Sequence, residues 1–308
     1  MTLKQLKAFY WAATLGSFAI AADRLNISQS SLSKRIAELE QDLGAELFDR
    51  STRRAVVSEI GDALLNGAKQ MLALEAELRG RISRRNEVIG TLRLGMGELS
   101  AATWFPKFVK RVAMVHPGLV VEPMVSQARA MELDVERGEL DCAVIAGVPT
   151  RPQIAAQSLG VIRFGWMASP NLQLDPQKPM DLMELLQVHP LIAPNSLSGQ
   201  LQGFSDWMIS AGIVVDRTIR CNSLNAIVEL TIAGAGVSLL PRQYLRPLVE
   251  RGLMVEVKND KQVPSLQYSF IWRRDDVRTI TEKAQELIVD EADFELTTPL
   301  WEVTGTAA

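Results

Sequence analysis

Residues 17–54 combine two short amphipathic patterns with a sharp turn between them, and this arrangement constrains the fold more than any other feature. Ser17 is placed to cap a helix whose small apolar residues allow another helix to approach closely. Asn26 favours the left-handed backbone that a sharp turn needs, and Ser28 is placed to cap the next helix. The segment therefore predicts two helices joined by a turn of about three residues.

The second of these helices has an apolar face and a polar face. Leu32, Ile36 and Leu39 recur at helical spacing and are expected to face the core. Hydrogen-bonding side chains remain exposed near the helix start: Ser28, Gln29, Ser30, Ser33 and Lys34. This pattern is typical of a recognition helix, which places donors and acceptors against base edges in the DNA major groove. The alternative is an ordinary helical hairpin with a solvated polar face.

A basic tip follows the second helix and argues against the ordinary hairpin. After Leu47 and Phe48, which are expected to return to the core, a short turn carries three arginines: Arg50, Arg53 and Arg54. Such a tip can contact phosphates or a narrow minor groove. The whole chain has a net charge of −3, but residues 1–57 hold eight Lys and Arg against six acids, giving +2 and leaving −5 for the rest. The basic charge is therefore local to this segment.

The order and spacing LSxxIxxLExxLGxxLFxR is filled from Leu32 to Arg50, and a pattern of this length is specific. Further matches lie upstream, at Phe9, Ala21, Ala22, Leu25, Ser28 and Gln29. The segment resembles the DNA-binding domain of LysR-type transcriptional regulators. The resemblance implies a winged helix-turn-helix over residues 1–58, with double-stranded DNA as partner. The chain departs from the usual pattern in having serines at 30 and 31, lysine at 34, and VSEIG at 57–61.

Residues 59–85 contain no proline and predict one long helix. Leu64, Met71 and Leu78 stand seven residues apart and form an apolar stripe without a partner in its own segment. The stripe either packs on a domain of the same chain or pairs with a second copy as a coiled coil. The resemblance implies a dimerisation linker over residues 59–89, with assembly into a homotetramer.

Beyond residue 90, predicted strands and helices alternate, which is typical of an α/β fold with parallel sheets and covering helices. Strands are expected at 91–96, 119–125, 142–146, 162–168, 191–193, 214–220, 237–240 and 266–272. The resemblance implies an effector-binding domain over 90–308, similar to periplasmic binding proteins. Its subdomain I is expected at 90–163 and 269–295 and its subdomain II at 164–268, with the chain crossing between them near 163–166 and 267–271.

Such a fold binds a small molecule between its subdomains. The loops at 97–103 and 195–198 and a helix start at 222–225 supply the candidate effector-binding residues: Glu98, Leu99, Ser100, Thr103, Asn195, Ser196, Ser198 and Asn225. Serines before helices are also common as plain N-caps. Aromatic residues such as Trp104, Trp166 and Trp207 could line the pocket, although core packing is their more frequent use. Glu98 would repel a carboxylate unless it is protonated or paired, so the family's usual small acidic inducer cannot be assumed.

Neither an enzyme nor a metal protein is indicated. The two histidines, His116 and His189, lack a nucleophile or a metal-spaced partner, and Cys142 and Cys221 lack CxxC spacing. Both cysteines are interpreted as small buried side chains, and a redox-sensing pair is the less favoured alternative. With no signal peptide or membrane span in sight, the cytoplasm is the expected compartment.

Three function classes remain: a ligand-responsive transcription factor, a small-molecule-binding protein without DNA activity, and a cytosolic enzyme with a helical appendage. The first is favoured because only it uses the recognition helix and the basic tip. No cofactor beyond a small-molecule effector is expected, and RNA polymerase is a further partner that the resemblance allows.

Overall fold

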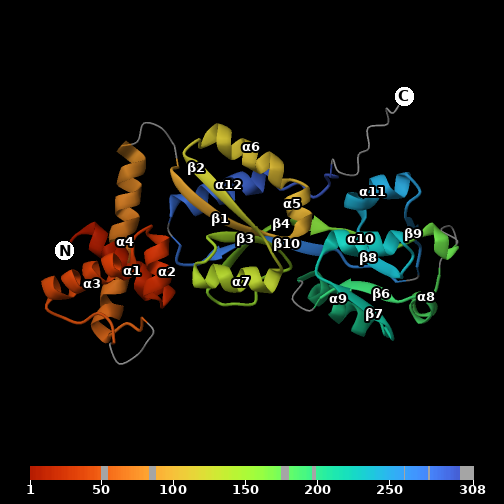
Figure 1. Ribbon diagram of the computed structural model, residues 1–308, viewed down its shortest axis with the longest axis horizontal. Helices are drawn as coiled ribbons and strands as arrows, with labels where there is room; N and C mark the ends of the chain where they lie inside the picture. Colours follow the sequence, from red (N-terminus) through yellow and green to blue (C-terminus); the bar gives the residue numbers. More distant parts are fainter. Residues whose placement is uncertain are drawn as a thin grey trace.

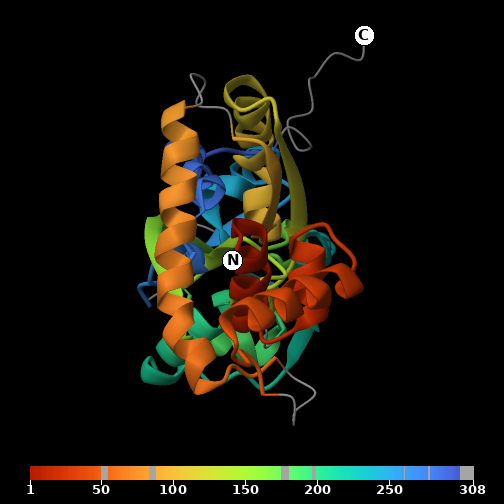
Figure 2. The same ribbon diagram turned by 90° about the vertical axis from the view of Figure 1, so that its left-hand side faces the viewer.

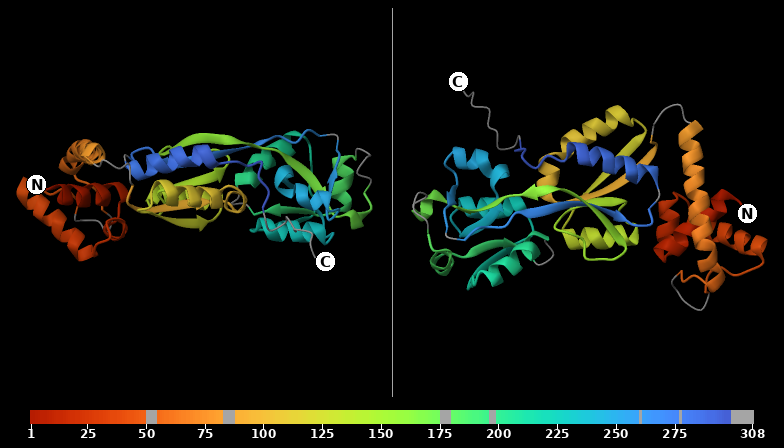
Figure 3. Two further views of the ribbon diagram at one scale, coloured as in Figure 1. Left: turned by 90° about the horizontal axis from the view of Figure 1, so that it is seen from above. Right: turned by 180° about the vertical axis from the view of Figure 1, so that it is seen from behind.

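The computed structural model describes residues 1–49, 55–82, 88–174, 180–195, 199–259, 261–276 and 278–298. Three parts follow one another along the longest axis: an N-terminal helical domain and two α/β subdomains, called I and II below (Figure 1). Seen from above, the three parts lie in one elongated row (Figure 3, left).

The N-terminal domain is a helix-turn-helix. It contains α1 (Leu3–Leu15), α2 (Phe18–Arg24) and α3 (Gln29–Leu43). The predicted caps are confirmed, because the hydroxyl groups of Ser17 and Ser28 accept hydrogen bonds from backbone N–H groups in the first turns of α2 and α3. Asn26 takes the left-handed conformation with φ of 51°, which turns the chain sharply between α2 and α3. Leu32, Ile36 and Leu39 are buried, as their spacing predicts.

The long helix α4 (Glu59–Ile82) runs beside the other N-terminal helices and extends past them (Figure 2). Ala68 is buried in the core of the N-terminal domain, and Leu64 packs half-buried against that core. Met71 and Leu74 are 44% and 55% exposed and therefore form an apolar strip on the outside of α4.

Subdomain I is a five-stranded sheet in the order β2-β1-β3-β10-β4. Its strands are β1 (Gly90–Met96), β2 (Leu119–Val125), β3 (Cys142–Ala146), β4 (Ile154–Ile162) and β10 (Leu266–Arg273). One face is covered by α6 (Phe105–Val115) and α12 (Thr279–Glu291), and the other by α7 (Ala128–Arg137) (Figure 1). The short helix α5 (Glu98–Ala102) follows β1 directly.

Subdomain II is a second five-stranded sheet, in the order β7-β6-β8-β5-β9. Its strands are β5 (Phe164–Ala168), β6 (Leu191–Pro194), β7 (Thr218–Cys221), β8 (Val237–Pro241) and β9 (Val255–Val257). Its helices are α8 (Leu182–Val188), α9 (Gly199–Ser210), α10 (Leu224–Ile232) and α11 (Arg242–Glu250), with a 3₁₀ turn at Pro170–Leu172.

The structure departs from the sequence prediction in several elements. Both sheets are mixed, because β10 runs antiparallel to β3 and β4 and β5 runs antiparallel to β8 and β9. The elements that were not predicted are α5, β4, β9, α11 and the 3₁₀ turn. The chain crosses to the second sheet between β4 and β5 and returns between residues 257 and 266, earlier than 267–271, because β10 pairs along its whole length in subdomain I.

Candidate DNA-binding surface and effector cleft

The first turns of α3 present a continuous polar surface to solvent. All five residues predicted there for DNA binding are exposed: Ser28, Gln29, Ser30, Ser33 and Lys34. Ser28 caps the helix and its hydroxyl group lies 3.0 Å from that of Ser30, so these two serines are partly engaged with each other. Gln29, Ser33 and Lys34 make no side-chain hydrogen bond or ion pair within the described residues, and they remain available to an external partner.

The core beneath α3 fixes the direction of this surface. Phe48 packs edge-on against Phe9 with ring centroids 5.6 Å apart, and also against Phe18 at 5.1 Å. An antiparallel bridge joins Phe48 to Val57, which places the start of a wing beside the helices. The predicted phosphate contacts Arg50, Arg53 and Arg54 lie outside the described residues.

A cleft with a volume of about 550 Å³ separates subdomain I from subdomain II. Its walls come from the ends of strands and the starts of helices of both subdomains, as expected for a ligand site in this kind of fold. Of the predicted effector residues, Glu98, Leu99 and Asn195 line this cleft.

The other predicted effector residues lie elsewhere. Ser100 and Thr103 are buried and do not line the cleft, because residues 98–102 form the helix α5 instead of an open loop. The hydroxyl group of Thr103 donates to the backbone oxygen of Leu99 at 2.7 Å. Asn225 is exposed beside the cleft, and Ser196 and Ser198 lie outside the described residues. Trp104 and Trp166 are fully buried, so they pack in the core and do not line the pocket.

Sequence reasoning missed several polar residues of the cleft. Ser126 and Gln127 follow β2, and Tyr268 lies near the start of β10, whereas Asn222 belongs to the helix start at 222–225 that the sequence did indicate. A polar pair between a strand and a helix, as at 126–127, is a signal that could have been used. Tyr268 gave no such signal, because its place in the cleft depends on the return of the chain to subdomain I. Burial raises the pKa of Tyr268, so its phenol group is neutral.

Glu98 connects the two walls of the cleft. Its Oε2 accepts hydrogen bonds from the backbone N–H of Leu224 at 2.5 Å and of Asn225 at 3.4 Å, at the start of α10. The hydroxyl group of Ser223, which caps α10, lies 3.4 Å from the same oxygen. A carboxylate is stabilised at a helix N-terminus because the free N–H groups and the helix dipole point toward it. The negative charge of subdomain I thus holds a helix of subdomain II.

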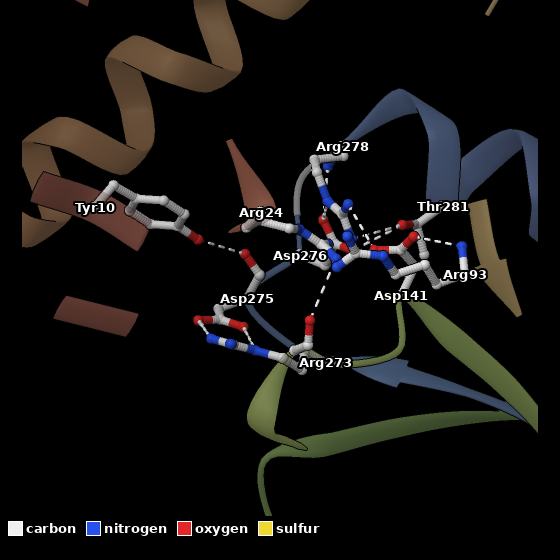
Figure 4. Close-up of polar contacts among 10 residues, drawn as sticks. Tyr10, Arg24, Arg93, Asp141, Arg273, Asp275, Asp276, Arg278 and Thr281 are labelled. Carbon is white, nitrogen blue, oxygen red and sulfur yellow. Dashed lines mark hydrogen bonds and ion pairs between the residues drawn. The ribbon is translucent and has the colours of Figure 1, made fainter. Parts of the chain in front are cut away.

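A second polar cluster joins the N-terminal domain to subdomain I (Figure 4). Arg24, at the end of α2, forms an ion pair with Asp141 and also donates to the backbone oxygen of Gly138 at 3.4 Å. Arg278 contacts the same Oδ1 of Asp141 at 2.9 Å and pairs with Asp276. The side chains of Arg24 and Asp141 are only 7% and 1% exposed, so this ion pair is shielded from solvent.

Helix α1 adds aromatic contacts to the same cluster. The ring of Trp11 lies 5.0 Å from the guanidinium carbon of Arg24 and 5.3 Å from that of Arg278, within cation–π range. The hydroxyl group of Tyr10 donates to the backbone oxygen of Asp275 at 3.0 Å. Burial, followed by the charge of Asp275, raises the pKa of Tyr10 to about 12. Nothing in the sequence predicted this interface, because its residues come from distant positions.

Charge balance explains how the cluster tolerates burial. Burial and the neighbouring charge of Arg278 lower the pKa of Arg24 to about 10, which still leaves Arg24 protonated at neutral pH. Burial acts to raise the pKa of Asp276, but hydrogen bonds from Arg278 and Thr281 outweigh it and the pKa is lowered. Two cations, Arg24 and Arg278, therefore face two anions, Asp141 and Asp276.

The two cysteines lie in different surroundings. Burial raises the pKa of the Cys142 thiol, which disfavours the reactive thiolate, whereas Cys221 is a free cysteine that lines the cleft. Across the described residues, no group of three His, Cys, Asp or Glu side chains is arranged to hold a metal ion. In the same part of the chain, no helix is both long and apolar enough to cross a membrane.

The fold and the two surfaces define a helix-turn-helix regulator with a ligand-binding domain. Residues 3–62 match the family described as bacterial regulatory helix-turn-helix protein, lysR family, and residues 85–288 match the LysR substrate binding domain. The HTH-type transcriptional regulator TdfR of Cupriavidus pinatubonensis is 30% identical over 281 residues, which cover 87% of this chain and 92% of TdfR.

Two solved structures show the same fold. A full-length OxyR variant from Pseudomonas aeruginosa has a TM-score of 0.63 at 22% identity, covering 94% of each chain. The full-length LysG of Corynebacterium glutamicum, with bound effector Arg, has a TM-score of 0.61 at 24% identity, covering 95% of this chain and 98% of LysG. The chain belongs to the LysR family of transcriptional regulators. It is a DNA-binding regulator and not an enzyme.

Proposed function

We propose that the chain reads its DNA site through the start of α3, with Gln29, Ser33 and Lys34 contacting base edges. The observation that supports this most directly is the exposure of all three side chains on a helix whose opposite face is buried in the core. Side chains at the start of a recognition helix are the ones that reach base edges when the helix lies in the major groove. Arg50, Arg53 and Arg54 supply phosphate or minor-groove contacts in this proposal.

The cleft between the subdomains binds a small-molecule effector in the same proposal. Its volume of about 550 Å³ is adequate for a small metabolite, and its walls belong to two separate sheets. A ligand that contacts both walls favours one arrangement of the subdomains over another, and it shifts DNA binding only through that difference in affinity. The bound arginine of LysG lends support to an effector in a protein of this fold.

The active assembly is a homotetramer built from dimers, with RNA polymerase as a further partner. The exposed apolar side chains of Met71 and Leu74 on α4 support self-association, because an apolar strip on a long helix is stabilised by pairing with another helix. A dimer would place two recognition helices about 34–36 Å apart, which matches successive major-groove faces.

The experiment that tests this function combines DNA binding with a ligand screen of the full-length chain. Ligands are found by the rise they cause in the unfolding midpoint, since binding to the native state raises apparent stability. Each one is then added to a binding assay with a DNA fragment that the chain selects. A ligand that binds the cleft and changes the affinity or the footprint supports the proposal. If ligands bind the cleft but do not change DNA binding, the result contradicts the proposed regulation and favours a receptor that does not regulate transcription.

A further inference from the structure

We infer that Glu98 is a built-in anion of the effector cleft, and that the natural effector is therefore an amine and not a carboxylate. This inference rests on the proposed function of the cleft. The position where helix α10 would hold the carboxylate of a ligand is already occupied by Oε2 of Glu98, which accepts the N–H of Leu224 at 2.5 Å.

The charges around the cleft support this class of ligand. Glu98 is the one charged residue among the described residues that line it, and lysine, arginine and histidine are absent from that lining. The three residues at 196–198, whose structure is not described, are Ser, Leu and Ser and carry no charge in the sequence. A carboxylate ligand would thus meet a negative charge without any cation to pair with.

A protonated amine meets the opposite situation. The second oxygen of Glu98, Oε1, accepts no hydrogen bond from the described part of the chain. An ammonium group can donate to this oxygen without displacing α10. Neutral acceptors that line the same cleft, such as the side-chain oxygens of Asn222 and Gln127, can accept its remaining hydrogen bonds. Glu98 would then select the ligand and hold the two subdomains together at the same time.

Two probes of similar size and opposite charge, benzylamine and benzoate, test the inference. Their binding to the full-length chain is measured by calorimetry and by the rise in the unfolding midpoint. The wild type is expected to bind benzylamine at least tenfold more tightly than benzoate. In Glu98→Ser the start of α10 is free to take an anion, so the order of the two affinities is expected to reverse. The control variant Glu122→Ser removes an exposed acid of β2 and should keep the wild-type order.

The outcomes separate this inference from the proposed function. The same order of affinities in the wild type and in Glu98→Ser, or no binding of either probe to either protein, would overturn the role of Glu98. A reversal of the order that leaves DNA binding insensitive to ligands of the cleft would uphold Glu98 and contradict the proposed regulation.

A second inference comes from the polar cluster of Figure 4. We propose that the N-terminal domain and subdomain I form one rigid body, held by the buried ion pair of Arg24 and Asp141. Burial gives this pair its importance, because an exposed ion pair contributes little, whereas breaking a buried one leaves an uncompensated charge.

Three central strands of subdomain I link this interface to the cleft. Strands β1 and β3 run parallel toward the cleft, where Gly97 follows β1 and Ala146 ends β3. At the other end, the carboxylate of Asp141, just before β3, accepts the backbone N–H of Arg93 in β1 at 2.7 Å. Strand β10 runs the opposite way, from Tyr268 in the cleft to the residues before Asp276. A movement of subdomain II about the cleft is therefore a movement relative to the N-terminal domain as well.

Distances between spin labels test the rigid body. Labels are placed at Asp42→Cys and Glu122→Cys in a Cys221→Ser background, and labelled chains are diluted into unlabelled ones so that distances within one chain dominate. A narrow distribution is expected for this protein. Arg24→Gln should broaden it, and so should Asp141→Asn, which keeps the size of the side chain. The exposed control Arg246→Gln should leave it narrow.

Circular dichroism melts identify variants that are unfolded, and these are replaced by Arg24→Lys, which keeps the charge but loses the planar guanidinium. A broad distribution in the starting protein would overturn the proposal. A distribution that stays narrow in folded Arg24 and Asp141 variants would overturn it as well.

Discussion

The carboxylate of Glu40, on α3, accepts a hydrogen bond from the backbone N–H of Leu47 at 2.8 Å. The next backbone N–H, of Phe48, approaches the same oxygen at 3.4 Å. This contact ties the chain that leaves α3 back onto the helix and allows the buried side chains of Leu47 and Phe48 to enter the core. It gives a physical reason for the spacing LExxLGxxLF, in which a carboxylate must stand seven residues before the leucine it anchors.

Replacing Glu40 by Ala should therefore destabilise the N-terminal domain. A hydrogen bond to a charged group contributes about 1.5–3 kcal/mol to the free energy of unfolding, and we expect a loss in this range. Urea unfolding monitored by circular dichroism measures it. The control Glu38→Ala removes an exposed acid of the same helix and should change the free energy of unfolding by no more than about 0.5 kcal/mol. Equal losses in the two variants would show that the contact with Leu47 is not the cause.

Gln29→Ala should weaken binding to the specific DNA site by about 1–3 kcal/mol, because a side chain that pairs with a base edge discriminates by that amount. Affinity for random DNA should stay nearly unchanged, since phosphate contacts supply it. Fluorescence anisotropy with specific and random duplexes measures both affinities. A loss of the same size on random DNA would assign Gln29 to backbone contact.

Arg53→Ala should reduce the slope of the logarithm of affinity against the logarithm of salt concentration by about one unit. Each phosphate that the protein neutralises releases counterions, and the slope counts these contacts. Titrations at a series of salt concentrations provide the slope for the wild type and the variant. If the slope is unchanged, Arg53 serves the fold instead of the DNA.

Changing both Met71 and Leu78 to Lys should dissociate the dimer. Lysine side chains in an apolar helix pair would bring like charges together in the seam. Sedimentation of the double variant should show a species smaller than the tetramer, with the helical content retained in circular dichroism. A tetramer that persists would exclude α4 as an interface.

Acid should weaken the interface of the N-terminal domain with subdomain I. The pKa of Asp276 in the folded state lies below its usual value, since the effect of burial is outweighed by Arg278 and Thr281. A carboxylate of this kind stabilises the fold at pH values above its unfolded pKa of about 3.9, and the contribution is lost as the pH falls through the folded pKa. The free energy of unfolding should then fall more steeply below about pH 4 in the wild type than in Asp276→Asn. Parallel curves for the two proteins would exclude this role of Asp276.

Local patterns were sufficient to predict the N-terminal domain. Ser17, Asn26 and Ser28 act through their own backbone conformation or through neighbours within four residues, so their roles can be predicted directly from the sequence. The polar start of α3 follows from the same helical periodicity that buries Leu32.

The cleft and the domain interface depend on contacts between distant residues and could be predicted only in part. Glu98 was found because it follows a strand, but its bond to Leu224 spans 126 residues. Tyr268 enters the cleft only because β10 returns to subdomain I and inserts between β3 and β4. From the sequence alone, Arg24 is interpreted as an ordinary charged residue at the end of a helix. Its burial against Asp141 follows from the packing of two domains.

Selection of binding sites from a random duplex library by the full-length chain tests the central claim most directly. We expect the library to become enriched in an inverted repeat whose half-sites lie about one helical turn, roughly 10 bp, apart or at a multiple of that spacing, since two recognition helices of a dimer must reach the same side of the duplex. The same selection with Gln29→Ala should weaken the preference at defined positions of each half-site. Absence of any enriched sequence with the folded wild-type chain would contradict the claim that α3 reads DNA.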